Sequence, residues 1–167
     1  FDDDAHLKST KTAIAFTSAM TDALAQLSVC IVGVSGTGSI VAEQLARLGF
    51  GEIILIDHDR LERRNLNRIL NSTCAEIGAL KVDMFADAIR RFRPDCEVRT
   101  VPTTLAAREA VLAASEADFI FSCVDTGEGR HIADRIAASF LMPLFDLGVS
   151  ILTRTSSAGA PAIAEVC

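Results

Sequence analysis

The sequence predicts an α/β fold: a doubly wound, mainly parallel, Rossmann-like sheet with helices on both faces. Short apolar runs, typical of strands buried on both sides, alternate with segments of helical period. A glycine-rich turn follows the first run, and an aspartate closes the second about 20 residues later. The chain has 167 residues, half of them hydrophobic, and can bury one core, so we expect one principal domain.

The unit at residues 29–59 contains both of these signals. Its two predicted strands are the apolar runs at residues 29–32 and 53–56. The helix between them has one apolar stripe and ends at Gly49. Residues 1–28, which precede the unit, carry only a weak stripe and are expected to form an N-terminal helical arm.

After this unit the chain continues to alternate between strands and helices. An Arg- and Asn-rich stretch at residues 60–71 is expected to be a loop with a short helical turn. The elements expected beyond it are a helix at residues 79–92, a strand at 97–101, an alanine-rich helix at 105–116 with Leu112 turned inward, a strand at 118–124, a helix beginning at Arg130 and a strand at 143–149. We therefore bound the main domain at residues 29–152 and expect a weakly patterned tail at 153–167, the start of a further C-terminal region.

The turn between the first strand and the first helix has the chemistry of an anion site. Gly33, Gly36 and Gly38 let the backbone approach a phosphate, and the helix N-terminus offers unpaired N–H groups with about half a positive charge. Asp57, at the end of the second strand, can accept hydrogen bonds from both ribose hydroxyls and would repel a 2′-phosphate, which argues against NADP. The alternative is that the glycines serve only close packing of the helix on the strand.

Two further charged residues lie where a ligand at this edge of the sheet would meet them. Lys81 is in the first turn of a predicted helix, where a cation opposes the helix dipole. A bound anion explains it better than helix stability does, and a solvated surface lysine is the alternative. Asp125 follows a buried strand and is either a ligand-binding acid or the N-cap of the next helix.

Composition argues against several classes of protein. The formal charge of −6 and the pI near 5.0 give no basic surface for nucleic acid. No apolar run approaches the roughly 20 residues of a membrane span. Five cysteines without a CxxC pair indicate free thiols in a reducing cytoplasm, and they support neither a zinc site nor a cysteine nucleophile.

Taken in order, these motifs resemble the ThiF/MoeB-type adenylyltransferases, whose fold also forms the adenylation domain of ubiquitin-activating enzymes. The resemblance covers residues 29–149, most of the chain. The matching segments are Gly33-Val34-Ser35-Gly36-Thr37-Gly38, Asp57-His58-Asp59, Asn65-Leu66-Asn67-Arg68, Gly78-Ala79-Leu80-Lys81, and Cys123-Val124-Asp125 with Arg130 five residues further on.

The resemblance implies ATP-dependent activation of a carboxylate to an acyl-adenylate, with release of pyrophosphate. The carboxylate would usually be the C-terminal glycine of a ubiquitin-like or sulfur-carrier protein, and the enzyme would be a homodimer. The residues implied in binding Mg-ATP are the glycine turn with Ser35, Asp57 at the ribose, Asn65 ordering the loop near the triphosphate, Arg68 and Lys81 at the phosphates, and Asp125, with Asp59, at Mg²⁺. A carboxylate nucleophile is already ionised at neutral pH, so the reaction needs positioning and charge neutralisation but no general base.

Three positions depart from the family pattern. Ser35 replaces the middle glycine of GxGGxG, and Ile69 stands where glutamine usually follows the loop arginine. The N-terminal arm offers only Lys8 or Lys11 in place of an arginine that many members contribute to the γ-phosphate. These departures favour a second interpretation, a non-catalytic nucleotide-binding or dimerising module of the same fold. A third is an NAD-dependent oxidoreductase, which the glycine turn and Asp57 alone would also suit.

Overall fold

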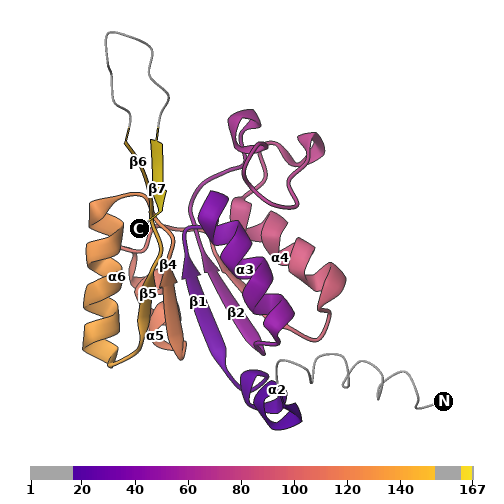
Figure 1. Ribbon diagram of the computed structural model, residues 1–167, viewed down its shortest axis with the longest axis vertical. Helices are drawn as coiled ribbons and strands as arrows, with labels where there is room; N and C mark the ends of the chain where they lie inside the picture. The colour runs from indigo at the N-terminus through magenta and orange to yellow at the C-terminus, as the bar shows by residue number, and fades with distance from the viewer. Residues whose placement is uncertain (1–16, 153–162, 167) are drawn as a thin grey trace, which may run out of the picture.

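The computed structural model describes residues 17–152 and 163–166, and its main body is a five-stranded sheet covered by helices (Figure 1). The sheet order is β3-β2-β1-β4-β5, and every neighbouring pair is parallel. The strands are β1 (Ser28–Val32), β2 (Glu52–Ile56), β3 (Glu97–Val101), β4 (Phe119–Ser122) and β5 (Leu144–Asp146). The chain winds outward from β1 in both directions, so the predicted doubly wound α/β fold is confirmed and β1/β4 is its switch point.

Two pairs of helices cover the sheet, one pair on each face (Figure 1). The helices on one face are α3 (Gly36–Leu48) and α4 (Lys81–Phe92), and those on the other are α5 (Arg108–Ser115) and α6 (Gly127–Phe140). Crossover connections of this kind are what parallel strands require, since their ends are too far apart for a tight hairpin.

Successive side chains of the central strand, β1, point to opposite faces of the sheet and pack in a separate core on each face. Val29 and Ile31 pack towards α3 and α4, whereas Cys30 and Val32 pack towards α5 and α6, and none of the four is more than 2% exposed. Burying an aliphatic side chain of this size stabilises a fold by roughly 1.5–3 kcal/mol. Because both faces are covered, the strand is a continuous apolar run and not an alternating one.

The connection from β2 to α4 is a structured loop. It contains the expected helical turn, η1 (Arg63–Asn65), and a second one, η2 (Cys74–Glu76). The two ends of the loop meet in an antiparallel bridge between Arg60 and Leu80. This bridge fixes where α4 begins, so the helix starts at Lys81, two residues later than predicted.

The predicted inward orientation of Leu112 is wrong. Its side chain is 45% exposed, while Ala110, Ala113 and Ala114 form the buried face of α5. These alanines lie at the i, i+3 and i+4 positions of one helical face, and Leu112 lies on the opposite side. Small side chains on the buried face let α5 approach the sheet closely.

Part of the expected arm and part of the expected tail are ordered elements. In the arm, α2 (Ser18–Leu24) is capped by Thr17, whose hydroxyl accepts a hydrogen bond from Met20 N, and no residue of α2 is buried. In the tail, β7 (Ile163–Val166) pairs antiparallel with β6 (Val149–Leu152). The rest of the arm, residues 1–16, and of the tail, residues 153–162 and 167, lies outside the described residues.

Candidate nucleotide-binding site

The glycine turn joins β1 to α3 at the carboxyl edge of the sheet. Gly33 has φ +87°, and a Cβ on it would lie 3.0 Å from the backbone oxygen of Cys123. A Cβ on Gly38 would overlap the carbonyl oxygen of Gly33. Glycine is therefore required at both positions: at Gly33 because of the left-handed backbone and the nearby Cys123, and at Gly38 because the first turn of α3 packs directly on the preceding turn.

Ser35 is the N-cap of α3, and its φ lies outside the left-handed region that favours glycine. Its φ is −105°, a value open to any residue, and its side chain makes no capping hydrogen bond. The hydroxyl is partly exposed beside the free N–H groups of the helix. The position of Ser35 therefore does not require the left-handed backbone that only glycine adopts freely.

Asp57 follows β2 and fastens its end to the glycine turn. One carboxylate oxygen accepts a hydrogen bond from Val34 N at 2.8 Å, and the other accepts one from Asp59 N at 2.9 Å. Asp57 is only 9% exposed. Each oxygen keeps a second lone pair, so the carboxylate can still accept a hydrogen bond from a ligand hydroxyl.

Asp59 and Lys81 form an ion pair beside this carboxylate. The Lys81 ammonium lies 2.6 Å from a carboxylate oxygen of Asp59, and its side chain is 5% exposed. The hydrogen bond from Lys81 holds the pKa of the Asp59 carboxyl below its ordinary value. The interpretation of Lys81 as a solvated surface lysine is therefore wrong: the cation is buried and has a protein partner.

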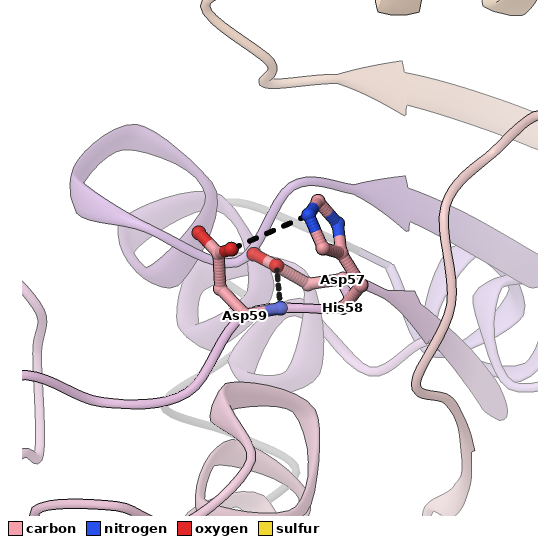
Figure 2. Close-up of side chains that lie close together, drawn as sticks. All are labelled: Asp57, His58 and Asp59. Atoms are coloured by element: carbon pink, nitrogen blue, oxygen red, sulfur yellow. Dashed lines mark hydrogen bonds and ion pairs between the residues drawn. The ribbon is translucent and has the colours of Figure 1, made fainter.

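Asp57, His58 and Asp59 lie close together, with the His58 ring directed at Asp59 (Figure 2). Carboxylate oxygens suit Mg²⁺, but the Asp57 oxygens already accept backbone N–H bonds and Asp59 already pairs with Lys81. Asp125 is exposed after β4. Asp59 is exposed as well. Among the described residues, however, Asp125 makes no ion pair, whereas Asp59 is held by Lys81, so Asp125 fits the metal better than Asp59 does.

The N-cap interpretation of Asp125 is also wrong, because the next residue caps the helix. The Thr126 hydroxyl accepts a hydrogen bond from Gly129 N at 3.2 Å at the start of α6. Asp125 stands two residues after Cys123, whose backbone contacts the Gly33 turn. Its chain segment thus runs beside the turn, on the opposite side from Asp57.

The loop between β2 and α4 brings Arg68 to the glycine turn. The aliphatic part of Arg68 lies against Gly36, where an added Cβ would be 3.4 Å from Arg68 Cδ. Asn65, 5% exposed, accepts a hydrogen bond from Glu62 N at 2.9 Å through its side chain and one from Arg68 N at 3.1 Å through its carbonyl. Asn65 therefore shapes the loop through these hydrogen bonds.

Several residues around the site were not singled out by the sequence analysis. Arg130 was noticed only as part of a motif; its guanidinium donates to Val124 O at 3.3 Å and lies 3.3 Å from Asp146, joining the ends of β4 and β5. Ser39 and Glu43 of α3 bond to the loop that carries Arg68. A buried serine and a glutamate four residues apart on a helix gave only a weak sequence signal, since their partners lie about 30 residues away.

A model of the ThiF family matches residues 9–158. The chain belongs to the ThiF family. Among curated relatives of this ThiF-family chain, ubiquitin-like modifier-activating enzyme 5 of Aedes aegypti is 33% identical over 137 residues, covering 75% of the chain and 34% of that protein. The tRNA threonylcarbamoyladenosine dehydratase of Haemophilus influenzae is 38% identical over 78 residues, covering 47% of the chain and 30% of that protein.

Solved structures agree with the family assignment. The E. coli tRNA N6-threonylcarbamoyladenosine dehydratase in complex with ATP superposes with a TM-score of 0.75 and 25% identity, covering 88% of this chain and 66% of that one. The ThiF-family chain spans about a third of the length of the curated relatives that it matches. No helix in the described part of the chain is long and apolar enough to cross a bilayer.

Proposed function

We propose that this ThiF-family chain carries the ATP site of an adenylyltransferase that activates a carboxylate. One observation supports it above the others: a continuous set of contacts links Lys81, Asp59 and Asp57 to the glycine turn. Lys81 pairs with Asp59, Asp59 N bonds to Asp57, and Asp57 bonds to the backbone of the turn. Arg68 approaches the same turn from the middle of the loop between β2 and α4.

The proposed division of roles follows from this arrangement. The glycine turn, with Ser35 at the helix N-terminus, holds phosphate oxygens through backbone N–H groups. Asp57 holds the ribose hydroxyls, and Arg68 and Lys81 neutralise the phosphates. A similar structure in complex with ATP supports the choice of nucleotide.

The reaction itself places few demands on the protein. A carboxylate oxygen of the substrate attacks the α-phosphorus of ATP, the bond from that phosphorus to the bridging oxygen breaks, and pyrophosphate leaves. The substrate carboxylate is ionised at neutral pH, so no proton has to be removed. The catalytic work is in-line positioning and neutralisation of the charge that builds up on the α-phosphate and the leaving group. Arg68 and Lys81 supply that neutralisation; Mg²⁺, held by Asp125 with or without Asp59, would add positive charge at the phosphates.

We propose a protein C-terminus of the ubiquitin-like or sulfur-carrier class as the carboxylate. The similarity to a ubiquitin-like modifier-activating enzyme supports it. The net charge of −6 also disfavours binding to a polyanion. A carboxylate carried by a modified tRNA is the competing source, because another relative is a tRNA threonylcarbamoyladenosine dehydratase. The proposal includes a homodimer in the cytoplasm, which sedimentation velocity and fractionation would test.

A non-catalytic nucleotide-binding module is the second candidate function. The observation that favours it is the 2.6 Å ion pair between Lys81 and Asp59, which already neutralises one of the two proposed catalytic cations. In such a module ATP would bind without being turned over. The two candidates therefore differ in exchange activity and agree on binding.

Pyrophosphate exchange into ATP tests the proposal in the full-length protein. We expect exchange that depends on the added carboxylate, supplied once as a ubiquitin-like protein ending in glycine and once as modified tRNA. Arg68→Ala and Lys81→Ala should each lower the rate about 10²-fold. Arg91→Ala, an exposed arginine on the same helix as Lys81, should have no effect.

Calorimetry measures the affinities for ATP and for NADH, which separate the candidate functions further. ATP binding without exchange under any condition would support the non-catalytic module. Tighter binding of NADH than of ATP would refute both candidates and favour the oxidoreductase.

A further inference from the structure

The loop that carries Arg68, residues 60–80, is closed at its base by backbone pairing. Leu61 N donates to Ala79 O at 2.8 Å, and Arg60 and Leu80 form an antiparallel bridge. Pairing at the base fixes the two ends of the loop, but it lies far along the chain from Arg68. Something else must hold the middle of the loop against α3.

Arg68 itself does not provide that hold. Its guanidinium donates to Arg64 O at 3.0 Å and to Asn67 Oδ1 at 3.4 Å, both within the loop. Among the described residues, no carboxylate lies within ion-pair distance of it. The aliphatic part of the side chain lies against Gly36, so the position of Arg68 beside α3 depends on the backbone that carries it.

The first contact that anchors the backbone of the loop is made by the hydroxyl of Ser39. It accepts a hydrogen bond from Leu70 N at 3.2 Å and donates one to Gly36 O at 2.9 Å. Ser39 is completely buried. A single hydroxyl, which can donate once and accept twice, thus joins the first turn of α3 to a residue two positions after Arg68.

The second anchoring contact is a hydrogen-bonded pair of side chains, one helical turn further along α3. Glu43 Oε2 accepts a hydrogen bond from Asn71 Nδ2 at 2.7 Å, and Glu43 Oε1 accepts one from Arg47 at 2.9 Å. Asn71 has φ +58°, a left-handed conformation that asparagine adopts more readily than most residues. Between Arg68 and Leu70, Ile69 is 4% exposed and packs in the core cluster that also contains residues of α3.

We infer that Ser39 and the Glu43–Asn71 pair are positioning residues that hold Arg68 over the N-terminus of α3. This inference rests on the proposed function, in which Arg68 meets the phosphates of ATP. An arginine side chain and an unanchored loop both lose conformational freedom when they bind a ligand. Fixing the loop in advance removes part of that cost, so ATP binds more tightly and its phosphates are held in a reactive position.

The exposed Glu43–Asn71 pair allows a test by exchange of partners. Asn71→Asp sets two carboxylates against each other while keeping a residue type that tolerates φ +58°. Adding Glu43→Gln restores one amide–carboxylate hydrogen bond in the opposite direction and returns the charge of the pair to its natural value. Ala75→Asp, on an exposed position of the same loop, is the control for the added charge alone.

The readout is the affinity for ATP and for AMP, measured by calorimetry. We expect Asn71→Asp to weaken ATP binding about tenfold and AMP binding less than about twofold, because AMP lacks the outer phosphates. The double variant should regain affinity to within about twofold, and Ala75→Asp should match the wild type. Asn71→Gly, which suits the same backbone but has no amide, should lose affinity as Asn71→Asp does.

The decisive comparison is made in an Arg68→Ala background. There Asn71→Asp should weaken ATP binding no further, because the residue it positions is absent. A second loss of equal size in that background, or an equal loss for AMP and ATP, would overturn the inference. Unchanged ATP affinity in Asn71→Asp would do the same and leave the proposed function standing. Unchanged affinity in Arg68→Ala itself would instead remove the role proposed for Arg68.

Discussion

Replacing Gly38 by alanine tests how closely α3 packs on the glycine turn. The added Cβ would overlap the Gly33 carbonyl oxygen and lie 2.8 Å from the Gly33 carbonyl carbon, below the 3.0 Å that real Cβ contacts keep. It would also lie 3.3 Å from Cys123 Cβ. The obstructing atoms are mainly backbone and cannot rotate away, so the helix or the turn must move.

Gly38→Ala should lower the free energy of unfolding by an amount at or above the upper end of the range typical of overpacking, roughly 1–3 kcal/mol. For a chain of this size, a loss of about 3 kcal/mol lowers the melting temperature by roughly 6–12 °C. The same displacement moves the N–H groups at the start of α3, so ATP affinity should fall as well.

Urea unfolding and thermal melts measure the effect, and Gly127→Ala is the matched control. Gly127 also lies in the first turn of a helix that follows a strand, but a Cβ there meets nothing within 4 Å. Gly127→Ala should be neutral or stabilise the fold by about 0.4–1 kcal/mol, because alanine has less freedom in the unfolded chain. Equal stability of Gly38→Ala and Gly127→Ala would refute the packing argument.

Three further predictions concern the acids and thiols near the site. In Asp57→Asn the amide oxygen can still accept one of the two backbone hydrogen bonds, but the amide nitrogen cannot accept the other. Urea unfolding should therefore show a loss of about 1.5–3 kcal/mol in the free energy of unfolding, and an unchanged midpoint would contradict this. The Asp59 pKa is depressed, so its ion pair stabilises the fold above the ordinary value of 3.8 and is lost as the pH falls through the lower folded-state value. The stability difference between wild type and Asp59→Asn should therefore be constant near neutral pH and shrink in acid, and a difference that persists at the lowest pH would rule the pair out. Burial raises the pKa of Cys30 and of Cys123 to about 12, so at about pH 8 iodoacetamide should modify the exposed Cys74 and spare both until denaturant is added. If mass spectrometry showed Cys123 reacting as fast as Cys74, the raised pKa of its partly buried thiol would be contradicted.

Where the pattern was local, sequence reasoning gave the elements closely. The strand expected at residues 53–56 is β2 (Glu52–Ile56), and the helix expected to end at Gly49 is α3 (Gly36–Leu48). Buried parallel strands and helical stripes depend on the order of neighbouring side chains, so a single sequence carries them. The start of α4 was placed two residues early because it depends on pairing between Arg60 and Leu80, which are not close in sequence.

For individual side chains the outcome was more mixed. Asp57 was expected to face a ligand, and it lies beside the glycine turn while also bonding to it. Leu112 was expected in the core because leucine is apolar, yet alanines on the opposite face of α5 fill that role. A helix that covers a sheet has a core-facing side and a solvent-facing side. An apolar residue can lie on either, and the shape of the neighbouring sheet decides which.

The sequence by itself determined the α/β class, the glycine turn after the first strand and the set of charged residues that the ThiF family places around it. Only the tertiary structure decided what those residues contact. Lys81 pairs with Asp59, which lies 22 positions earlier in the chain, and the backbone N–H of Leu70 donates to the Ser39 hydroxyl, 31 positions earlier. Periodicity and turn chemistry act between near neighbours in the chain, whereas ion pairs and buried hydrogen bonds depend on which segments the sheet brings side by side.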